Sequence, residues 1–477
     1  MKLMTSLMGA AIALALGGCA SMAPHYERPA TPVADTYPGA KAEQAANTNA
    51  VPAAELSWRA LFADEKLKQV VQRSLDNNRD LRIAALRVEQ AQAQHRIQRS
   101  ALFPSVGASA AEVAQRSPDS LSMPGQPNVM KAYSASVGIN AYELDLFGRV
   151  RSLNEEALQA YLATGEAQRS VHMGLVAQVA ATYMAMAADG SLEALAKQTL
   201  ESRERAYDIQ KQRQDVGASS ALELRQAEAE REDARAQWLD ASKQLELDRN
   251  ALDLLVGSKV PDELLPKPGS LGDMLAVDTL PAGLPSRLLQ DRPDILAAEH
   301  QLQGANANIG AARAAFFPSI SLTASAGTAS NELSGLFEGG GSTWSFIPVI
   351  NIPIFNGGRL KAQLDVSKVR KEIAVAEYER TIQVAFREVA DELATRRVVA
   401  EQESARRKQA DAAEAARRMV TSRYSEGVVG YLEVLDAQRT AYTAQQTVIA
   451  AELARQVNVV SLYKALGGGW DNLAEVE

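Results

Sequence analysis

The sequence predicts a mainly α-helical protein with a small β part, built as a duplicated unit of helix, hairpin, long helix and return helix. Two helix-forming segments, 78–105 and 292–319, align without gaps, and both end in Phe-Pro-Ser. A segment that alternates between polar and apolar residues follows in each half, and then a long stretch without proline. A repeat of this length fixes the architecture before any single element is assigned.

The composition suits long helices that pack through small side chains. Hydrophobic residues make up 46% of the chain but aromatic residues only 5%, and alanine is abundant. The net charge of −8 argues against a nucleic-acid partner, because nucleic-acid-binding proteins usually carry a basic face. No run of roughly 18 apolar residues lies beyond the N-terminus, so the sequence predicts no membrane-spanning helix in the mature chain.

The N-terminus predicts export and lipidation. Lys2 is followed by an apolar stretch over 7–16 and then by Leu-Gly-Gly-Cys, which resembles the cleavage box of bacterial lipoproteins. We expect 1–18 to be a lipoprotein signal peptide, Cys19 to carry a covalent lipid, and 19–52 to be a flexible tether. Ala20, in place of aspartate, favours the outer membrane in the familiar sorting pattern. The alternative is a secretory signal with a chance cysteine. No other cofactor is expected, and the single cysteine excludes an internal disulfide.

The helical segments end in strands, which we expect at about 104–115, 132–146, 318–328 and 342–355. Proline stops each helix because it lacks a backbone donor. Alternation then places one set of side chains on a single apolar face; the set is Tyr133, Ala135, Val137, Ile139, Ala141, Ile320, Leu322, Ala324 and Ala326. Pro348 and Pro353 indicate that part of the fourth strand is edge-like or irregular.

Long helices follow at about 148–214 and 358–425, and return helices at 220–256 and 430–466. A helix of this length would extend for roughly 100 Å. Matching turns contain Gly217 and Gly427, which suit the C-terminal stop of a helix. The two repeats therefore cover 53–257 and 291–469, with a linker at 258–290 and a tail at 470–477.

Four short strands cannot close a membrane barrel alone, and an open sheet edge is not tolerated in lipid. Several chains therefore share one barrel, or the strands form an ordinary soluble sheet. Export, lipidation and one-sided strands favour the shared barrel, from which the long helices would project as a tube.

The chain resembles the outer membrane factors of the TolC and OprM type, in particular the lipoprotein branch of efflux outer-membrane proteins. The resemblance covers nearly the whole mature chain and rests on the order of its motifs, which are NNRDL (77–81), the paired FPS, YELDLFGR (142–149), NIPIFNGGR (351–359), GYLEVLDAQR (430–439) and ALGGGW (465–470). It implies a homotrimer with a twelve-stranded barrel in the outer membrane and an α-helical tunnel across the periplasm. The linker at 258–290 would then lie in an equatorial region.

The resemblance also implies function and partners. Such a channel passes small molecules, such as drugs and toxic compounds, from an inner-membrane RND-type transporter and a periplasmic adaptor (membrane fusion) protein to the outside. Two alternatives stay open, a type I protein-secretion channel and a non-conducting lipoprotein tether or coiled-coil spacer.

The second turn is the candidate periplasmic gate. Leu432, Glu433 and Asp436 are near neighbours on a helix, and in a trimer each would form a ring of three, apolar or acidic. The resemblance places aperture residues at these positions and a gate-bond tyrosine at Tyr424. A basic partner found in the TolC branch would fall on Val429, which puts that pairing in doubt. The alternative is that the two acids only favour the helix dipole.

Gly217 and Gly427 mark the hairpins that adaptors of the family contact, although both also suit plain turn glycines. Glu223 is a weaker candidate at the first turn. The chain is not expected to be an enzyme, because its four histidines, His25, His95, His172 and His300, show no metal-ligand spacing. The run 339–341 is interpreted as a hairpin loop rather than a phosphate loop.

Overall fold

The computed structural model describes residues 21–38, 53–118, 128–277, 280–281, 288 and 292–470. The predicted signal peptide and Cys19 lie outside these residues. The chain divides into two units. The first comprises Met1–Ala30, Arg87–Gly165 and Ala297–Tyr378, and the second Thr31–Leu86, Glu166–Leu296 and Glu379–Glu477.

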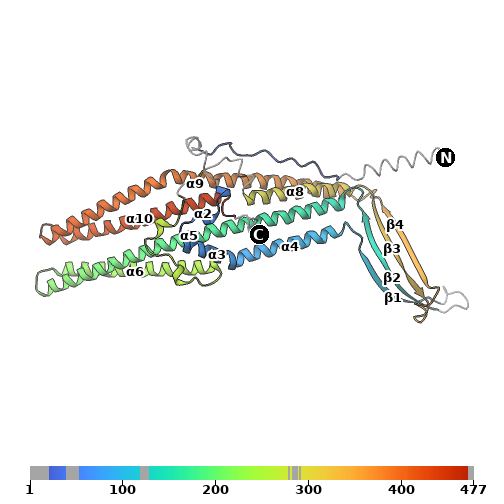
Figure 1. The fold of residues 1–477 in the computed structure, drawn as a ribbon, viewed down its shortest axis with the longest axis horizontal. Coiled ribbons are helices and arrows are strands. Elements are labelled where there is room, and N and C mark those ends of the chain that lie inside the picture. Colours follow the sequence, from blue (N-terminus) through green and yellow to red (C-terminus); the bar gives the residue numbers. More distant parts are fainter. Residues whose placement is uncertain are drawn as a thin grey trace. The chain divides into compact units, whose positions relative to one another are not determined.

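The element order repeats one pattern twice (Figure 1). The first copy contains α4 (Arg79–Ser100), β1 (Val106–Arg116), β2 (Val129–Leu144), α5 (Arg149–Asp215) and α6 (Ala221–Val256). The second contains α8 (Pro293–Ala314), β3 (Ser319–Ser330), β4 (Ser342–Asn351), α9 (Arg359–Ser425) and α10 (Tyr431–Ala465). Short elements precede and join the copies, namely η2 (Ala53–Glu55), α2 (Trp58–Leu61), α3 (Glu65–Asn77), η4 (Asp262–Leu264) and η5 (Leu271–Asp273). The predicted fold class, a duplicated and mainly helical unit with four strands, is confirmed.

The two long helices, α5 and α9, have 67 residues each. Helix α5 contains a stretch of 18 residues with a mean hydropathy of 1.3, apolar enough to cross a membrane by composition. However, 61% of that stretch is buried inside the protein. In the second unit its side chains Tyr183 and Met184 join Trp58, Leu61 and Tyr463 among the most deeply buried residues. Packing against protein therefore accounts for the apolar character of α5.

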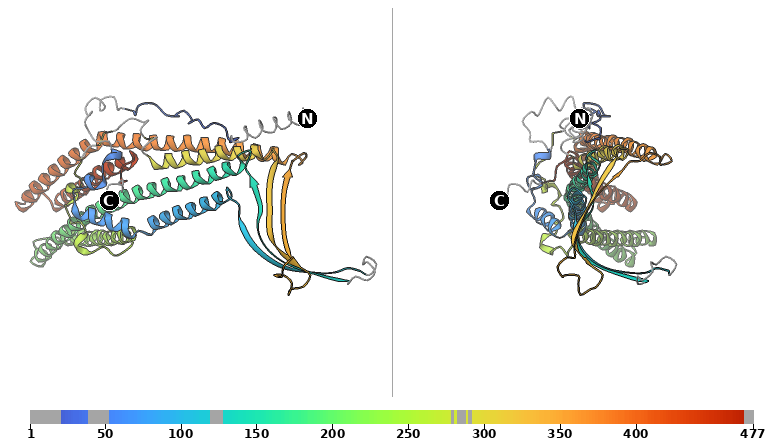
Figure 2. Two further views of the ribbon diagram at one scale, coloured as in Figure 1. Left: turned by 45° about the vertical axis from the view of Figure 1, so that its right-hand side comes forward. Right: turned by 90° about the vertical axis from the view of Figure 1, so that its right-hand side faces the viewer.

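The four strands form one antiparallel sheet in the order β1-β2-β3-β4 (Figure 2). Residues paired across antiparallel strands share a face. Val137 pairs with Ala326, which pairs with Trp344, so these side chains lie on one face. Ser136 pairs with Gly327, which pairs with Thr343, on the other face. The sheet therefore has an apolar face and, across β2 and β3, a face of mainly small polar residues, as the alternation predicts; on β4, Ile347 and Val349 interrupt the polar face.

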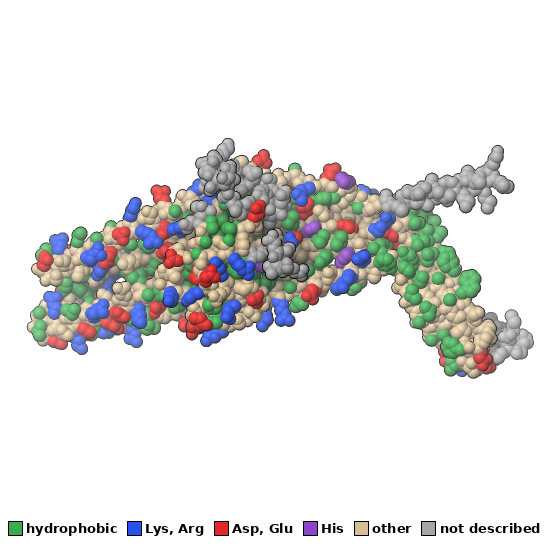
Figure 3. All heavy atoms as spheres, in the orientation of Figure 1, with side chains coloured by type: hydrophobic (Ala, Val, Ile, Leu, Met, Phe, Trp, Pro, Cys, Tyr) green, Lys and Arg blue, Asp and Glu red, His purple; other side chains and the backbone are tan. Residues whose placement is uncertain are grey.

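The apolar face is uncovered in the single chain. Trp344 is 80% exposed, and Val106, Val137, Phe346 and Ile350 are also exposed. Figure 3 shows hydrophobic side chains over the visible face of the sheet, whereas acidic and basic side chains are spread over the helices. An apolar surface of this extent is unusual for a protein in water and marks an interaction site.

A β-bulge corrects the predicted face of one residue. The sequence places Ala141 on the apolar face, but the pairing of β2 with β3 shifts between Ile139 and Tyr142. Ala141 adopts a positive φ of 48°, and its N–H donates to the Thr323 hydroxyl instead of continuing the ladder. After the bulge, Tyr142 lies opposite Leu322. The extra residue moves Tyr142 to the apolar face and Glu143 to the polar one.

The predicted tether also differs from the structure where the structure describes it. Residues 21–30, called the strap below, pack along α8 in the first unit. Arg28 and the Tyr26 hydroxyl both donate to Glu299, and the Asn306 amide donates to the Pro24 carbonyl. In the second unit, the Tyr37 ring stacks on Phe386 at 5.0 Å. The proline- and alanine-rich composition of 19–52 predicted flexibility. The contacts that hold this segment could not be seen in it, because the partners lie far away in the sequence.

Candidate functional site

The two faces of the sheet differ in chemical character. The small polar face is bridged across strands by the hydroxyl pairs Ser109–Ser136 at 3.2 Å and Ser325–Ser345 at 2.8 Å. Strands β1 and β4 each pair on one side only in the described sheet. A curved sheet with two open edges, one apolar face and one polar face has the features of a segment of a water-filled barrel in lipid.

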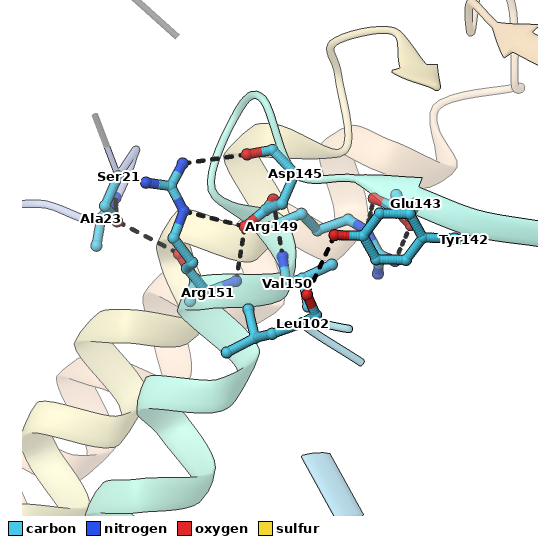
Figure 4. A network of polar contacts seen from close by, with 10 residues as sticks. Ser21, Ala23, Leu102, Tyr142, Glu143, Asp145, Arg149, Val150 and Arg151 are labelled. Carbon is cyan, nitrogen blue, oxygen red and sulfur yellow. Dashed lines mark hydrogen bonds and ion pairs between the residues drawn. The ribbon is translucent and has the colours of Figure 1, made fainter. Parts of the chain in front are cut away.

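Ion pairs secure the junction where β2 passes into α5 (Figure 4). The Glu143 carboxylate pairs with Arg149, and the Asp145 carboxylate pairs with Arg151 at 3.1 Å. Asp145 also accepts hydrogen bonds from the backbone N–H of Val150 and Arg151, at 3.0 and 2.8 Å. These are unpaired donors of the first turn of α5, so the carboxylate caps the helix. The YELDLFGR motif is thus a strand-to-helix joint.

The turns at the far ends of the long helices are near copies of each other. Gly217 and Gly427 have φ angles of 74° and 77°. In each turn, the N–H of the residue after the glycine donates to a carbonyl five residues back, Arg213 or Arg423. This is the left-handed helix stop that favours glycine. The backbone therefore explains both glycines, and their predicted contact with an adaptor stays a prediction.

The predicted gate residues divide into two groups. Leu432 is 64% exposed, and Glu433 and Asp436 are exposed beside it on α10. Tyr431, Val434 and Leu435 point the other way, into a small core. The structure therefore brings the three aperture candidates to one free surface, where a neighbouring chain or the channel could meet them. Their role in a gate stays a prediction.

Tyr424 lies away from that surface and bonds one hairpin to the other. Its hydroxyl accepts from Gln210 Nε2 at 2.8 Å and from Arg213 at 3.1 Å, both on α5. Its ring lies 5.6 Å from that of Tyr431. Tyr424 thus makes a bond between the α9–α10 and α5–α6 hairpins, through glutamine and arginine rather than through Val429.

Glu223, the weaker candidate, has a local explanation. Its carboxylate accepts from the Ser219 hydroxyl at 2.7 Å and from the Ser220 backbone at 3.1 Å, which completes a capping box on α6. These hydrogen bonds hold the pKa of Glu223 below its usual value. Capping accounts for this residue.

A charged network that the sequence did not reveal joins three helices beside the gate candidates. Glu230 of α6 accepts from Arg439 of α10 at 2.8 Å and lies 3.4 Å from Arg203 of α5. Arg203 also donates to Gln438 of α10. The side chain of Arg203 is 7% exposed and that of Glu230 is 14% exposed. Burial lowers the pKa of Arg203, and the Glu230 carboxylate opposes this change. These residues tie α10 to the α5–α6 hairpin.

Three of the four histidines contact other kinds of side chain. His95 stacks on Tyr161, His172 meets Trp470 edge-on, and His300 Nδ1 lies 2.6 Å from Gln159. Among the described residues, no three His, Cys, Asp or Glu side chains are grouped so that they could hold a metal ion.

Comparison with known proteins identifies the class to which this geometry belongs. The family model for "Outer membrane efflux protein" matches residues 70–258 and 284–468. The toluene efflux pump outer membrane protein TtgC of Pseudomonas putida is 48% identical over 467 residues, which are 98% of this chain and 96% of the relative. Outer membrane protein OprJ of Pseudomonas aeruginosa is 46% identical over 96% of this chain and 95% of its own.

Solved structures agree. The open state of the MtrE outer membrane channel of Neisseria gonorrhoeae is 40% identical, with a TM-score of 0.85 over 94% of this chain and 98% of that one. A membrane protein from Pseudomonas aeruginosa gives a TM-score of 0.87 at 44% identity, over 94% and 100%. The chain belongs to the outer membrane efflux protein family. It is an outer-membrane channel protein that acts in efflux, and the resemblance to this family is confirmed. Membership of the lipoprotein branch stays a prediction.

Proposed function

We propose that three copies of the chain form the outer-membrane channel of a tripartite pump, which receives small molecules from an inner-membrane RND-type transporter through a periplasmic adaptor. The observation that carries the proposal is the four-stranded sheet with open β1 and β4 edges and an exposed apolar face. In lipid, each open edge must pair with another strand. Three copies would supply twelve strands and leave no edge.

The helices support the same assembly. Exposed apolar side chains recur along α4 and α9, namely Ile83, Leu86, Ile97, Val366, Val369, Ile373, Val384 and Val398. Within each helix they lie 3, 4, 11 or 14 residues apart, and these separations return to one side of a helix, as in a helix seam. Contact with the neighbouring copy would cover these stripes.

The exposed Leu432, Glu433 and Asp436 would then form the periplasmic aperture. An acidic ring in a narrow opening attracts cations and repels anions, while a leucine ring forms a dry constriction. The turns at Gly217 and Gly427 lie at the hairpin ends that would meet the adaptor, and a lipid on Cys19 would anchor the chain to the outer membrane.

The substrates are proposed from the names of the relatives. These include a toluene efflux pump protein and an antibiotic efflux pump protein of Pseudomonas putida. We therefore favour small organic molecules as cargo over exported proteins, the type I secretion alternative.

The experiment is conductance of the purified full-length protein in a planar bilayer, with Asp436→Ala and Asp240→Ala compared. Asp240 is an exposed acid on α6 that pairs with Lys243, so its loss changes the charge equally without touching the turn. Small wild-type conductance that rises in Asp436→Ala alone supports channel and gate. Steady conductance unchanged by either substitution overturns the gate. No conductance from a folded, heat-sensitive trimer overturns the channel.

A further inference from the structure

An open cavity of about 570 Å³ lies where the strap meets the end of α8. It is lined by Ser21, Met22, Ala23, Arg313, Phe316, Phe317 and Leu364. Four of these side chains are large and apolar, and Arg313 is the one with a charge. A guanidinium beside an apolar wall is the pattern expected for a ligand with an anionic head and a hydrocarbon tail.

Most of the N–H donors of the Arg313 guanidinium are unused among the described residues. Its one hydrogen bond in the described structure runs from a guanidinium nitrogen to the Met22 carbonyl at 3.2 Å, and no ion pair with a carboxylate is seen among the described residues. A guanidinium carries five N–H donors and stays protonated. The charge also lies in the last turn of α8, where the helix dipole favours a cation. The cavity can therefore take up a negative group without first breaking an ion pair.

The apolar wall lies at the border of the membrane-facing sheet. Phe316 and Phe317 are both exposed, and Phe317 stacks on Phe147 at 4.8 Å. Strand β3 begins two residues later at Ser319, and Ile320 and Leu322 open its apolar face. Since that face contacts hydrocarbon, the cavity lies at the depth of the headgroups on the periplasmic side.

We propose that this cavity binds one glycerophospholipid of the periplasmic leaflet, with its phosphate on Arg313 and an acyl chain along Phe316, Phe317 and Leu364. Arginine suits this role because its planar fork binds phosphate oxygens in pairs. The rival occupant is the covalent lipid expected on Cys19, two residues before Ser21. Its diacylglyceryl group has no phosphate, so it would leave the guanidinium unmatched, and charge complementarity favours the phospholipid.

The duplication supplies a matched control within the same chain. Arg99, Leu102 and Phe103 occupy the positions in the first copy that Arg313, Phe316 and Phe317 occupy in the second. The strap packs on the second copy, where Gly310 leaves room for it: a Cβ at Gly310 would lie 2.6 Å from the Ala23 nitrogen. The equivalent position in the first copy is Arg96, whose long side chain excludes that approach.

The test uses full-length protein in detergent with measured amounts of dioleoylphosphatidylglycerol, and counts bound lipids by native mass spectrometry. Dioleoylglycerol serves as the same tail without phosphate, and inorganic phosphate as the anion without tail. We expect one retained phospholipid per chain in the wild type and in Arg99→Gln. Affinity should fall about tenfold or more in Arg313→Gln, because a charge-assisted contact is lost.

A photo-crosslinker, p-benzoylphenylalanine in place of Phe316, then reports what occupies the wall. Capture of the added phospholipid supports the proposal. Capture of the chain's own lipidated N-terminal peptide overturns it in favour of the Cys19 lipid. Equal binding of dioleoylglycerol, equal loss in Arg99→Gln and Arg313→Gln, or competition by inorganic phosphate alone would each overturn it as well.

Discussion

Glu230→Gln should destabilise the contact between α10 and the α5–α6 hairpin more than the loss of an exposed charge nearby. Glu230 is the carboxylate that faces Arg203 and Arg439, at 3.4 and 2.8 Å. Glutamine keeps the size of the side chain but removes the charge, and it offers the two arginines one acceptor oxygen in place of two. Arg203, at 7% exposure, would be left as a buried cation with only the weaker attraction of Asp233 to balance it.

The magnitude follows from burial. Breaking a buried ion pair from one side costs about 3–5 kcal/mol. Arg203 borders a polar cavity of about 220 Å³, where water can reach it, so we expect a cost at or just below this range, about 2–3 kcal/mol. Removing Arg439 instead should cost at most about 1 kcal/mol, because its side chain is largely exposed and surface pairs are weak.

Hydrogen exchange is the suitable assay, because a lipid-embedded oligomer does not unfold in two states. Local opening in α5 near Arg203 and in α10 near Gln438 should quicken by roughly 30- to 150-fold in Glu230→Gln. Arg439→Gln should change the rate by about fivefold or less. Glu228→Gln, which breaks an exposed pair with Arg225, is the control. If Glu230→Gln exchanges no faster than this control, the buried network does not hold the hairpins together.

Two further predictions concern the sheet and the long helix α5. Gly138→Ala should abolish assembly of the heat-sensitive trimer, seen in unheated gel samples, because its Cβ would lie 2.3 Å from the Ala324 carbonyl oxygen. Gly339→Ala, in the loop between β3 and β4 with nothing within 4 Å, should assemble normally. Burial, together with the hydrogen bond and charge of Asp248, raises the pKa of Asp189 to about 7. The folded state therefore keeps a proton that the unfolded chain releases above about pH 4, so stability falls as pH rises from about 4 to 7. Asp189→Asn should unfold at a higher temperature than wild type at pH 8 and at the same temperature at pH 4; equal melting at pH 8 would contradict this sign.

The helices and the repeat were predictable because local signals carry them. Pro104 and Pro318 end both helical segments, and the long proline-free stretches match the 67-residue helices. The polar composition of 401–418 indicates a solvated helix surface, and most of the segment is exposed, but Glu403 is buried between Arg407 and Arg455. Composition can indicate that a helix is polar, but it does not indicate which charge the neighbouring helix will cover.

The bulge at Ala141 shows where alternation fails. Alanine is tolerated on either face of a sheet, so Ala141 gives no sign that the alternation of polar and apolar residues is interrupted. The sequence did hold a signal, because continued alternation would place Glu143 in the membrane-facing row, where a carboxylate is costly. At Glu143 the bulge removes this conflict, since one extra residue moves every later side chain to the opposite face. The rule is not general, because Glu112 and Lys131 lie in the apolar row without a bulge.

The position of the candidate gate residues was predictable from the sequence, but the charged network beside them was not. Leu432, Glu433 and Asp436 share one exposed face, as their spacing requires. Arg203 and Glu230 come from helices that meet α10 only in the folded chain, and their charges look like any others on a polar helix. Which of many similar charged residues is buried depends on tertiary contacts. A local stretch of sequence does not show these contacts.

Divergence between the two copies has the same origin. Glu299, Asn306, Gly310 and Arg313 all contact the strap, and their spacing places them on one face of α8. The equivalent residues of α4 are Ala85, Gln92, Arg96 and Arg99. Ala85 cannot bind a guanidinium, and Arg96 fills the space that Gly310 leaves open. If α4 and α8 had kept identical sequences, the N-terminal strap would find two equivalent binding surfaces. These differences provide contacts for the strap on α8 and block the equivalent surface of α4. The position of the strap is therefore specified both by favourable residues on α8 and by unfavourable ones on α4.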